Sequence, residues 1–260
     1  MGGMAVGKVM AVVNQKGGTA KTTTTVNVGA YLAMAGRRVL LVDMDPQGNA
    51  TSGLGIDKRQ VKHCIYNVLI DDTPLASVMM RSCVEGLEIV PATLNLAGAE
   101  IELVSLISRE HRLKNALADV RAMFDYVLID CPPSLGLLTL NALTAADSAL
   151  VPIQCEFYAL EGLSQLLRTI EMVRKHLNPG LAIEGIVLTM HDSRTNLSQQ
   201  VVEDVRRNLS ERVFDTAIPR NVRLSEAPSY GLPIPLYDDK SRGAEAYRSL
   251  AGEIMSREGA

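Results

Sequence analysis

The chain of 260 residues contains no tryptophan, three Phe and seven Tyr, although 47% of its residues are hydrophobic. Its core must therefore be built from aliphatic side chains such as Val, Leu, Ile, Ala and Met. No run of 18 apolar residues occurs, so we expect no segment that spans a membrane. The first residues, MGGMAVGKV, lack the apolar stretch of a signal peptide, and we expect none.

Cysteine and histidine are few and widely spaced. The four cysteines form no CxxC pair, and the four histidines do not stand at metal-ligand spacing. We therefore expect buried, reduced thiols rather than a structural zinc site or a redox motif. The net charge is −3, so the chain as a whole is not a polyelectrolyte for nucleic acid. Binding to DNA would need a local basic patch.

Short, almost continuously apolar runs alternate with stretches of helical periodicity. Such runs are typical of parallel strands buried on both faces, and they occur at 9–14, 38–43, 87–91, 126–130, 149–154 and 183–190. Helical periodicity is found at 22–35, 97–122 and 159–177. The alternation predicts an α/β fold with a doubly wound, mostly parallel sheet flanked by helices. We see no linker or repeat, and we predict one domain over residues 1–260, with a flexible N-terminus at 1–7.

The stretch NQKGGTAKTTTT, residues 14–25, lies between the first predicted strand and the first predicted helix. This is the context of a phosphate-binding loop, in which backbone N–H groups converge on phosphate oxygens at a helix N-terminus. Lys21 would add positive charge at the β- and γ-phosphates, and the Thr22 hydroxyl would bind Mg²⁺.

This loop departs from the common phosphate-loop pattern. Two positions that usually hold glycine are occupied by Gln15 and Ala20, and a second lysine, Lys16, precedes the two glycines of the loop. The methyl group of Ala20 is tolerated if φ is negative at that position, and it clashes if φ is positive. The sequence does not distinguish between these two conformations. A slower turnover of the nucleotide, caused by Ala20, therefore stays open as well.

Acidic residues stand at the ends of two predicted strands. In open α/β sheets, ligands bind at the carboxyl ends of the strands. Asp43 and Asp45 end the second strand, and their i, i+2 spacing places both on one side of an extended segment. Asp130 ends the strand YVLID. The three carboxylates therefore lie where this fold places its ligands.

Four motifs in order carry a family resemblance. KGGTAKTT resembles the deviant Walker A loop, KGGxGKT followed by Ser or Thr, and LLVDMDPQGNAT, YVLIDCPPS and IPRNVRLSEAPSYGLPI follow it. Over about residues 8–250 the chain is thereby similar to the ParA/Soj family of chromosome- and plasmid-partitioning ATPases. The resemblance implies a P-loop NTPase of the deviant Walker A class, a slow ATPase that uses ATP and Mg²⁺.

The resemblance also assigns roles to individual residues. Lys16 is the signature lysine, which reaches phosphates bound in the other protomer of an ATP-dependent homodimer. Asp45 positions the attacking water, Asp43 helps to hold Mg²⁺ or its waters, and Asp130 orders Mg²⁺ through water. The expected sites are therefore catalytic Lys16, Lys21 and Asp45; magnesium-binding Thr22, Asp43 and Asp130; and ATP-binding Lys16, Gly17, Gly18, Thr19, Ala20, Lys21, Thr22, Thr23, Pro219 and Asn221.

Residues 168–223 contain nine Lys/Arg and seven Asp/Glu, a net charge of +2 that leaves −5 on the rest of the chain. Within this stretch Arg194 and Arg223 match family arginines that bind double-stranded DNA without sequence preference. The resemblance further implies a ParB/Spo0J-like partner that stimulates hydrolysis, and a cytoplasmic, nucleoid-associated protein. The first strand begins near residue 8, so we expect no N-terminal helix-turn-helix domain and no operator-specific repression.

Other classes of protein contain similar loops. A membrane-cycling ATPase of the MinD type stays an alternative, although the final EAYRSLAGEIMSREGA has no Phe or Trp and carries several acids, which argues against membrane docking. A nitrogenase-type reductase would need a second well-placed cysteine, and a bacterial tyrosine kinase would need a Tyr-rich tail. An ATP-binding switch without significant turnover stays open because of Ala20.

Overall fold

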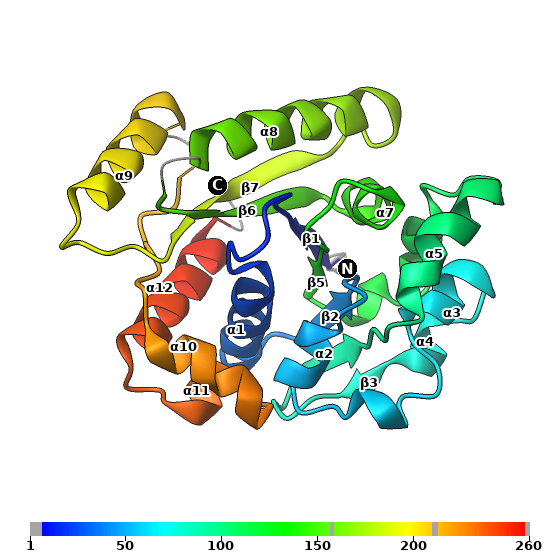
Figure 1. The fold of residues 1–260 in the computed structure, drawn as a ribbon. Coiled ribbons are helices and arrows are strands. Elements are labelled where there is room, and N and C mark those ends of the chain that lie inside the picture. The colour runs from blue at the N-terminus through cyan, green and yellow to red at the C-terminus, as the bar shows by residue number, and fades with distance from the viewer. Residues whose placement is uncertain (1–6, 157–158, 210–212, 258–260) are drawn as a thin grey trace, which may run out of the picture.

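The structure is a computed structural model that describes residues 7–156, 159–209 and 213–257. A seven-stranded sheet in the order β3-β4-β2-β5-β1-β6-β7 forms its centre (Figure 1). Every neighbouring pair is parallel except β3 and β4, which confirms the predicted doubly wound, mostly parallel sheet. The strands are β1 (Lys8–Val12), β2 (Val39–Asp43), β3 (Met80–Arg81), β4 (Leu87–Val90), β5 (Tyr126–Asp130), β6 (Ser148–Gln154) and β7 (Ala182–Thr189).

Helices cover both faces of this sheet. In the view of Figure 1, α7 and α8 lie on one side of the strands, and α1 and α12 lie on the other. The helices are α1 (Lys21–Met34), α2 (Asn49–Gly53), α3 (Ile65–Ile70), α4 (Leu75–Val78), α5 (Leu96–Glu102), α6 (Arg112–Ala118), α7 (Leu137–Ala145), α8 (Ala159–His176), α9 (Asn196–Leu209), α10 (Val222–Glu226), α11 (Ile234–Tyr237) and α12 (Arg242–Ser256). Short 3₁₀ turns are η1 (Lys58–Gln60), η2 (Leu103–Ser105), η3 (Arg121–Met123) and η5 (Ala227–Tyr230).

The strands divide the core into two hydrophobic clusters. Successive side chains of a strand point to opposite faces, so Val9 and Ala11 of β1 join the cluster under α7 and α8, whereas Met10 and Val12 join the cluster under α1 and α12. All four side chains are at most 1% exposed. Burial on both faces explains why these strands read as continuous apolar runs in the sequence.

Six predicted strands and two predicted helices agree with the structure to within two residues at each end. The helix predicted over 97–122 is wrong as a single element. The chain leaves helical geometry at Leu106, whose φ and ψ are −85° and 143°, and Ser108 has a positive φ of 52°. A right-handed helix cannot continue through such a residue. The segment is instead divided among α5, η2, α6 and η3.

The N-terminal residues 1–6, for which we predicted flexibility, lie outside the described residues. Gly7 is buried, and its carbonyl oxygen accepts a hydrogen bond of 2.7 Å from Nε of Arg121. Across 7–156, 159–209 and 213–257, no helix combines the length and the apolar character needed to cross a membrane.

Candidate functional site

The loop between β1 and α1 lies at the carboxyl edge of the sheet, and side-chain hydrogen bonds fix its course. The amide of Asn14 donates to the carbonyl oxygen of Pro152 in β6 (2.7 Å), and its oxygen accepts from the backbone N–H of Lys16 (3.0 Å). Farther along, the Thr189 hydroxyl of β7 donates to the carbonyl oxygen of Thr19 (3.1 Å). Two neighbouring strands therefore hold the loop at both of its ends.

The two lysines of the loop lie in different environments. Lys21 is 6% exposed, and its Nζ donates to the carbonyl oxygen of Lys16 (3.1 Å). Burial lowers the pKa of Lys21, and the nearby carboxylate of Asp130 acts in the opposite direction. The side chain of Lys16 is 44% exposed, and its Nζ lies 3.2 Å from a carboxylate oxygen of Glu156. Lys21 is thus folded into the loop, whereas Lys16 is held at the surface.

The backbone angles of Ala20 show which of the two possible loop conformations is present. Its φ and ψ are 66° and 29°, in the left-handed region that favours glycine. Gly18 has a similar φ of 75°. For an L-residue with a β-carbon the left-handed conformation costs about 1–2 kcal/mol. The loop therefore keeps a glycine-like backbone at Ala20 without the residue that adopts it most easily.

Two buried carboxylates lie behind the loop. Asp43 of β2 and Asp130 of β5 are register partners, and both are 0% exposed. Asp130 accepts hydrogen bonds from the hydroxyls of Thr22 (2.7 Å) and Thr25 (3.0 Å). Asp43 accepts from the backbone N–H (2.8 Å) and the hydroxyl (2.7 Å) of Thr51. Burial raises the pKa of both carboxyl groups, and the charge of Asp43 adds to the rise at Asp130.

The donor set beside the loop fits a magnesium ion that is carried largely by phosphates and water. Mg²⁺ in such sites keeps several waters and takes few protein ligands. In keeping with this, the part of the chain that the structure describes contains no cluster of three or more His, Cys, Asp or Glu side chains arranged as a metal site. Thr22 lines the cavity of the loop, and its hydroxyl donates to the carboxylate of Asp130 (2.7 Å). A cation here would offset the repulsion between the buried carboxylates.

A cavity of about 360 Å³ opens over the loop. Its walls hold most of the predicted phosphate and catalytic residues: Gly17, Gly18, Ala20, Lys21, Thr22, Thr23 and Asp45. Asp45 is only 7% exposed, and its carboxylate accepts from the backbone N–H of Gln47 (2.9 Å). Among the other predicted residues, Thr19, Asp43 and Asp130 are buried and do not line this cavity, and Lys16 lines a separate hollow beside Pro133.

A second cavity of about 280 Å³ adjoins the first and shares Ala20, Thr23 and Met190 with it. Pro219 and Asn221, the predicted adenine-side residues, line this second cavity. Several residues of the two walls were not predicted from the sequence, namely Gln47, Asn49, Met190, Leu224 and Tyr247. Gln47 and Asn49 could have been found, because they directly follow Asp45 at a strand end. Tyr247 lies on α12, far along the chain, and no local pattern marks it.

The two arginines predicted to contact DNA are brought to neighbouring segments. A bridge between His191 and Pro219 joins the chain after β7 to the chain before α10. Arg194 lies just beyond this bridge, with its guanidinium 2.8 Å from the carboxylate of Asp192 and its side chain 86% exposed. Arg223 is 53% exposed and pairs with Glu226 (2.9 Å) and Asp238 (3.3 Å). Both arginines are at the surface, and each has an acidic partner within the chain.

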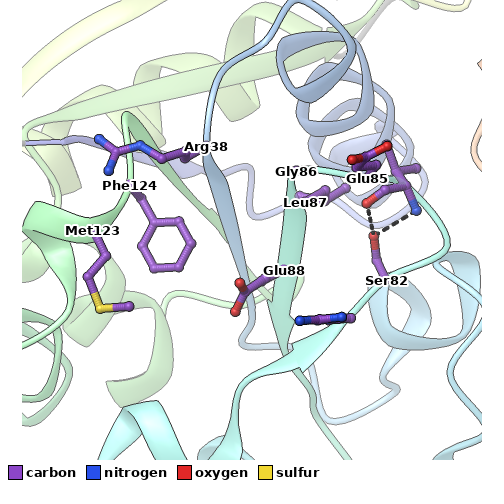
Figure 2. A pocket seen from close by; sticks show the side chains of 10 residues that line it. Arg38, Ser82, Glu85, Gly86, Leu87, Glu88, Met123 and Phe124 are labelled. Carbon is purple, nitrogen blue, oxygen red and sulfur yellow. Dashed lines mark hydrogen bonds between the residues drawn. The ribbon is translucent and has the colours of Figure 1, made fainter.

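A cavity of about 410 Å³ lies at the opposite, amino-terminal edge of the sheet. Figure 2 shows Arg38, Phe124 and Met123 on one side of it, with Ser82, Glu85 and Leu87 across from them. The guanidinium of Arg38 is already paired with Asp125 at 2.8 Å. None of the predicted site residues lines this cavity.

Comparisons with known proteins agree with one another on the family. A family model described as an AAA domain matches residues 7–183. The chain is 62% identical over 251 residues to the sporulation initiation inhibitor protein Soj of Bacillus subtilis, covering 96% of this chain and 99% of Soj. It is 56% identical over 257 residues to the chromosome partitioning protein ParA of Myxococcus xanthus, with 99% and 91% covered. The chain belongs to the ParA/Soj family of P-loop ATPases.

A solved structure of a ParA/Soj-like fold supports the assignment of ligands. A protein from Mycobacterium smegmatis, described as cobyrinic acid a,c-diamide synthase, is 44% identical, with a TM-score of 0.86 and with 98% of this chain and 96% of that one covered. It was solved with ADP and magnesium, and also with an ATP analogue and magnesium. These ligands are consistent with ATP and Mg²⁺ as the cofactors of this ParA/Soj-type ATPase. The synthase activity is named only for the Mycobacterium smegmatis protein.

Proposed function

We propose that this ParA/Soj-family chain is an ATP-dependent dimerising switch in chromosome or plasmid segregation. ATP holds two copies together, and the dimer binds duplex DNA of any sequence. Hydrolysis is slow until a partner protein stimulates it, and it then releases the protein from DNA. The observation that carries the proposal is the separation of the two loop lysines. One is folded against the loop backbone and the other is half-exposed at its rim.

Lys16 is the residue proposed to join the two copies. In the single chain its ammonium group pairs with Glu156 at 3.2 Å, and both side chains are nearly half-exposed. An ion pair of this kind contributes only about 0–1 kcal/mol. The ion pair therefore keeps Lys16 at the rim of the loop. It is too weak to prevent Lys16 from binding a stronger partner instead. The phosphates of an ATP bound in a second copy are such a partner, because charge-assisted hydrogen bonds to phosphate are short and strong.

Hydrolysis is assigned to the cavity above the loop. Loop N–H groups and Lys21 would bind the phosphates, with Thr22 contacting a magnesium ion and with Asp43 and Asp130 acting behind it. The bound ion would offset negative charge on the phosphates. Asp45 faces the same cavity, where its carboxylate could orient the attacking water. Lys21 supplies positive charge at this cavity and Arg220 lines the adjoining one, and we propose that a partner supplies a further basic residue. Intrinsic turnover is expected to be slow for this reason.

DNA binding is assigned to the joined segments after β7 and before α10. Arg194 and Arg223 project at the surface there, and exposed pairs with nearby carboxylates are weak enough to yield to a phosphate backbone. Contacts to phosphate alone carry no sequence information, so no operator preference is expected. Two copies double the number of contacts, which makes DNA binding depend on dimerisation and hence on ATP.

A ParB/Spo0J-like DNA-binding protein is the proposed partner, and the proposed location is the cytoplasm, in association with the nucleoid. Among the described residues, the lining of the phosphate cavity holds Lys21 but no arginine, which favours a partner that supplies a basic residue in trans.

The test of this function is the rate of ATP hydrolysis by the full-length protein. It is measured with Mg²⁺ or EDTA, with and without duplex DNA, and with and without the purified ParB/Spo0J-like protein of the same genome. The proposal predicts slow, Mg²⁺-dependent turnover that rises when DNA and the partner are both present. A rate that the partner leaves unchanged in the presence of DNA would contradict it.

A further inference from the structure

The segment that joins β5 to α7, residues 131–136, lies between the nucleotide cavity and the surface that carries Lys16. We call it the bridging segment. Its Pro133 lines both the cavity over the phosphate loop and the hollow beside Lys16, and Ser134 lines the same hollow. A β-carbon placed on Gly17 of the loop would lie 3.9 Å from Cβ of Pro133. The bridging segment therefore contacts the loop on one side and borders the Lys16 surface on the other.

Hydrogen bonds hold the bridging segment at both of its ends. At its start, the backbone N–H of Cys131 donates to the carbonyl oxygen of Val12 in β1 (3.3 Å). Just beyond its end, two N–H groups in the first turn of α7 donate to one carboxylate, that of Glu100 on the neighbouring helix α5 (Figure 1). The distances are 2.9 Å from Leu137 and 3.3 Å from Leu138. One end of the segment is thus fixed by a side chain 37 positions earlier in the chain.

The carboxylate of Glu100 replaces the side chain that usually caps a helix. The first N–H groups of a helix have no partner within it, and a Ser, Thr, Asp or Asn at the N-cap position commonly supplies an acceptor. The N-cap residue of α7 is Gly136, which has no side chain. A carboxylate at this place also interacts favourably with the positive end of the helix dipole. Without Glu100, these N–H groups would turn to water and the bridging segment would lose its fixed end.

The absence of a side chain at Gly136 makes room for the carboxylate. A β-carbon at this position would lie 2.5 and 2.6 Å from the two carboxylate oxygens of Glu100, and its three nearest atoms all belong to that carboxyl group. The φ and ψ of Gly136 are −81° and −168°, which residues other than glycine also adopt. Gly136→Ala therefore displaces the carboxylate while Glu100 itself is kept.

We propose that Glu100 is a positioning residue for dimerisation, whose carboxylate holds the bridging segment in the arrangement in which a second copy docks beside Lys16. This inference rests on the proposed function. When the cap is lost, the segment adopts further arrangements, and only a fraction of the molecules can dock. The apparent dissociation constant rises as this fraction falls. Both copies must be competent, so a fall of about threefold in each copy raises the dimer dissociation constant about tenfold.

Two dissociation constants test the inference in the full-length protein. Sedimentation velocity with ATP over a range of protein concentrations gives the constant of the dimer, and titration with ADP gives that of the nucleotide site. Glu100→Ala should raise the first at least about tenfold and change the second by less than about twofold, because Glu100 does not line the nucleotide cavities. A residue that served only the stability of the fold would not separate the two constants.

The matched control is Glu102→Ala on the same helix. The carboxylate of Glu102 also accepts a hydrogen bond, but from the hydroxyl of Tyr66 on α3 (2.9 Å) and not from α7. This variant should leave both dissociation constants as they are in the parent protein.

Gly136→Ala perturbs the same contact from its other side. It should raise the dimer dissociation constant as Glu100→Ala does. The double variant should show about the same rise as either single variant, because changes that remove one shared contact are not additive. If Glu100→Ala does not fold, Gly136→Ala decides the outcome alone.

The possible results separate this inference from the proposed function. If the parent dimerises with ATP and neither Glu100→Ala nor Gly136→Ala weakens the dimer, the inference is wrong and the proposed function stands. The inference is also wrong if ADP binding weakens as much as dimerisation, if Glu102→Ala has the same effect, or if the two single effects multiply in the double variant. A parent protein that stays monomeric with ATP contradicts the proposed function, and the inference then fails with it.

Discussion

Replacing Ala20 by glycine should make the protein more stable. Ala20 has φ 66° and ψ 29°, and its carbonyl oxygen accepts the first helical hydrogen bond of α1 from Thr24 N–H at 2.8 Å. The left-handed backbone is therefore locked in place by the start of a buried helix. Glycine adopts this conformation without the clash of a β-carbon, so Ala20→Gly removes strain and leaves the loop geometry unchanged.

The size of the effect follows from two opposing contributions. Relief of the left-handed strain is worth about 1–2 kcal/mol. A new glycine also raises the entropy of the unfolded chain, which costs about 0.4–1 kcal/mol. The balance is a gain of about 1 kcal/mol in the free energy of unfolding. For a chain of this size that gain corresponds to a rise in Tm of roughly 2–4 °C.

Thermal unfolding without nucleotide measures this effect, with Gly18→Ala as the matched control. Gly18 has φ 75°, and an added β-carbon would meet no atom within 4 Å, so its substitution introduces the same backbone strain without a steric clash. Gly18→Ala should lower the Tm by an amount similar to the rise in Ala20→Gly. An Ala20→Gly protein that unfolds at a lower temperature than the parent would refute the reasoning, since it would mean that the methyl group packs favourably.

The remaining predictions concern the switch. Lys16→Ala should still bind ATP but lose ATP-dependent dimerisation in sedimentation, and a variant that dimerises normally would remove Lys16 from the interface. Glu156→Gln frees Lys16 from a half-exposed ion pair, so the dimer dissociation constant should change by no more than about fivefold, and a larger change would show that the pair controls assembly. Asp45→Ala should bind ATP and stay on DNA while its turnover falls by on the order of 10²-fold, and unchanged turnover would assign Asp45 another role. The double variant Arg194→Glu with Arg223→Glu should bind all duplex sequences more weakly and with a flatter salt dependence, and wild-type binding at matched salt would contradict the assignment.

The sheet could be predicted well because its strands are short, parallel and buried on both faces. β1 and β5, for example, read as unbroken apolar runs in the sequence and pair along their whole length in the structure. The two-residue strand β3 was missed, since its exposed Met80 and Arg81 give no such pattern. The helix expected over 97–122 failed for a related reason. Apolar residues at 101, 104 and 107 continue the helical spacing in the sequence up to the break at Leu106 and Ser108, so the pattern gave no sign of that break.

For the site, the local sequence predicted which side chains lie around the loop, but not the loop conformation or the long-range contacts. The loop lysine, the hydroxyl of Thr22 and the strand-end carboxylates could be located from spacing alone. The backbone angle of Ala20 could not, because an alanine gives no sign of a positive φ. The pair between Lys16 and Glu156 joins residues 140 positions apart, and only the folded chain brings them together. Asp192 and Glu226 lie within three residues of Arg194 and Arg223, whereas Asp238, the second partner of Arg223, is brought to it only by the fold.

The central claim is that ATP joins two copies of this chain through Lys16, and sedimentation velocity tests it most directly. The parent protein and Lys16→Ala are compared with ATP, with ADP and without nucleotide, each with and without duplex DNA. The account predicts that only the parent with ATP sediments as a dimer and that only this species binds DNA. A parent protein that stays monomeric with ATP, or a Lys16→Ala protein that dimerises as the parent does, would contradict it.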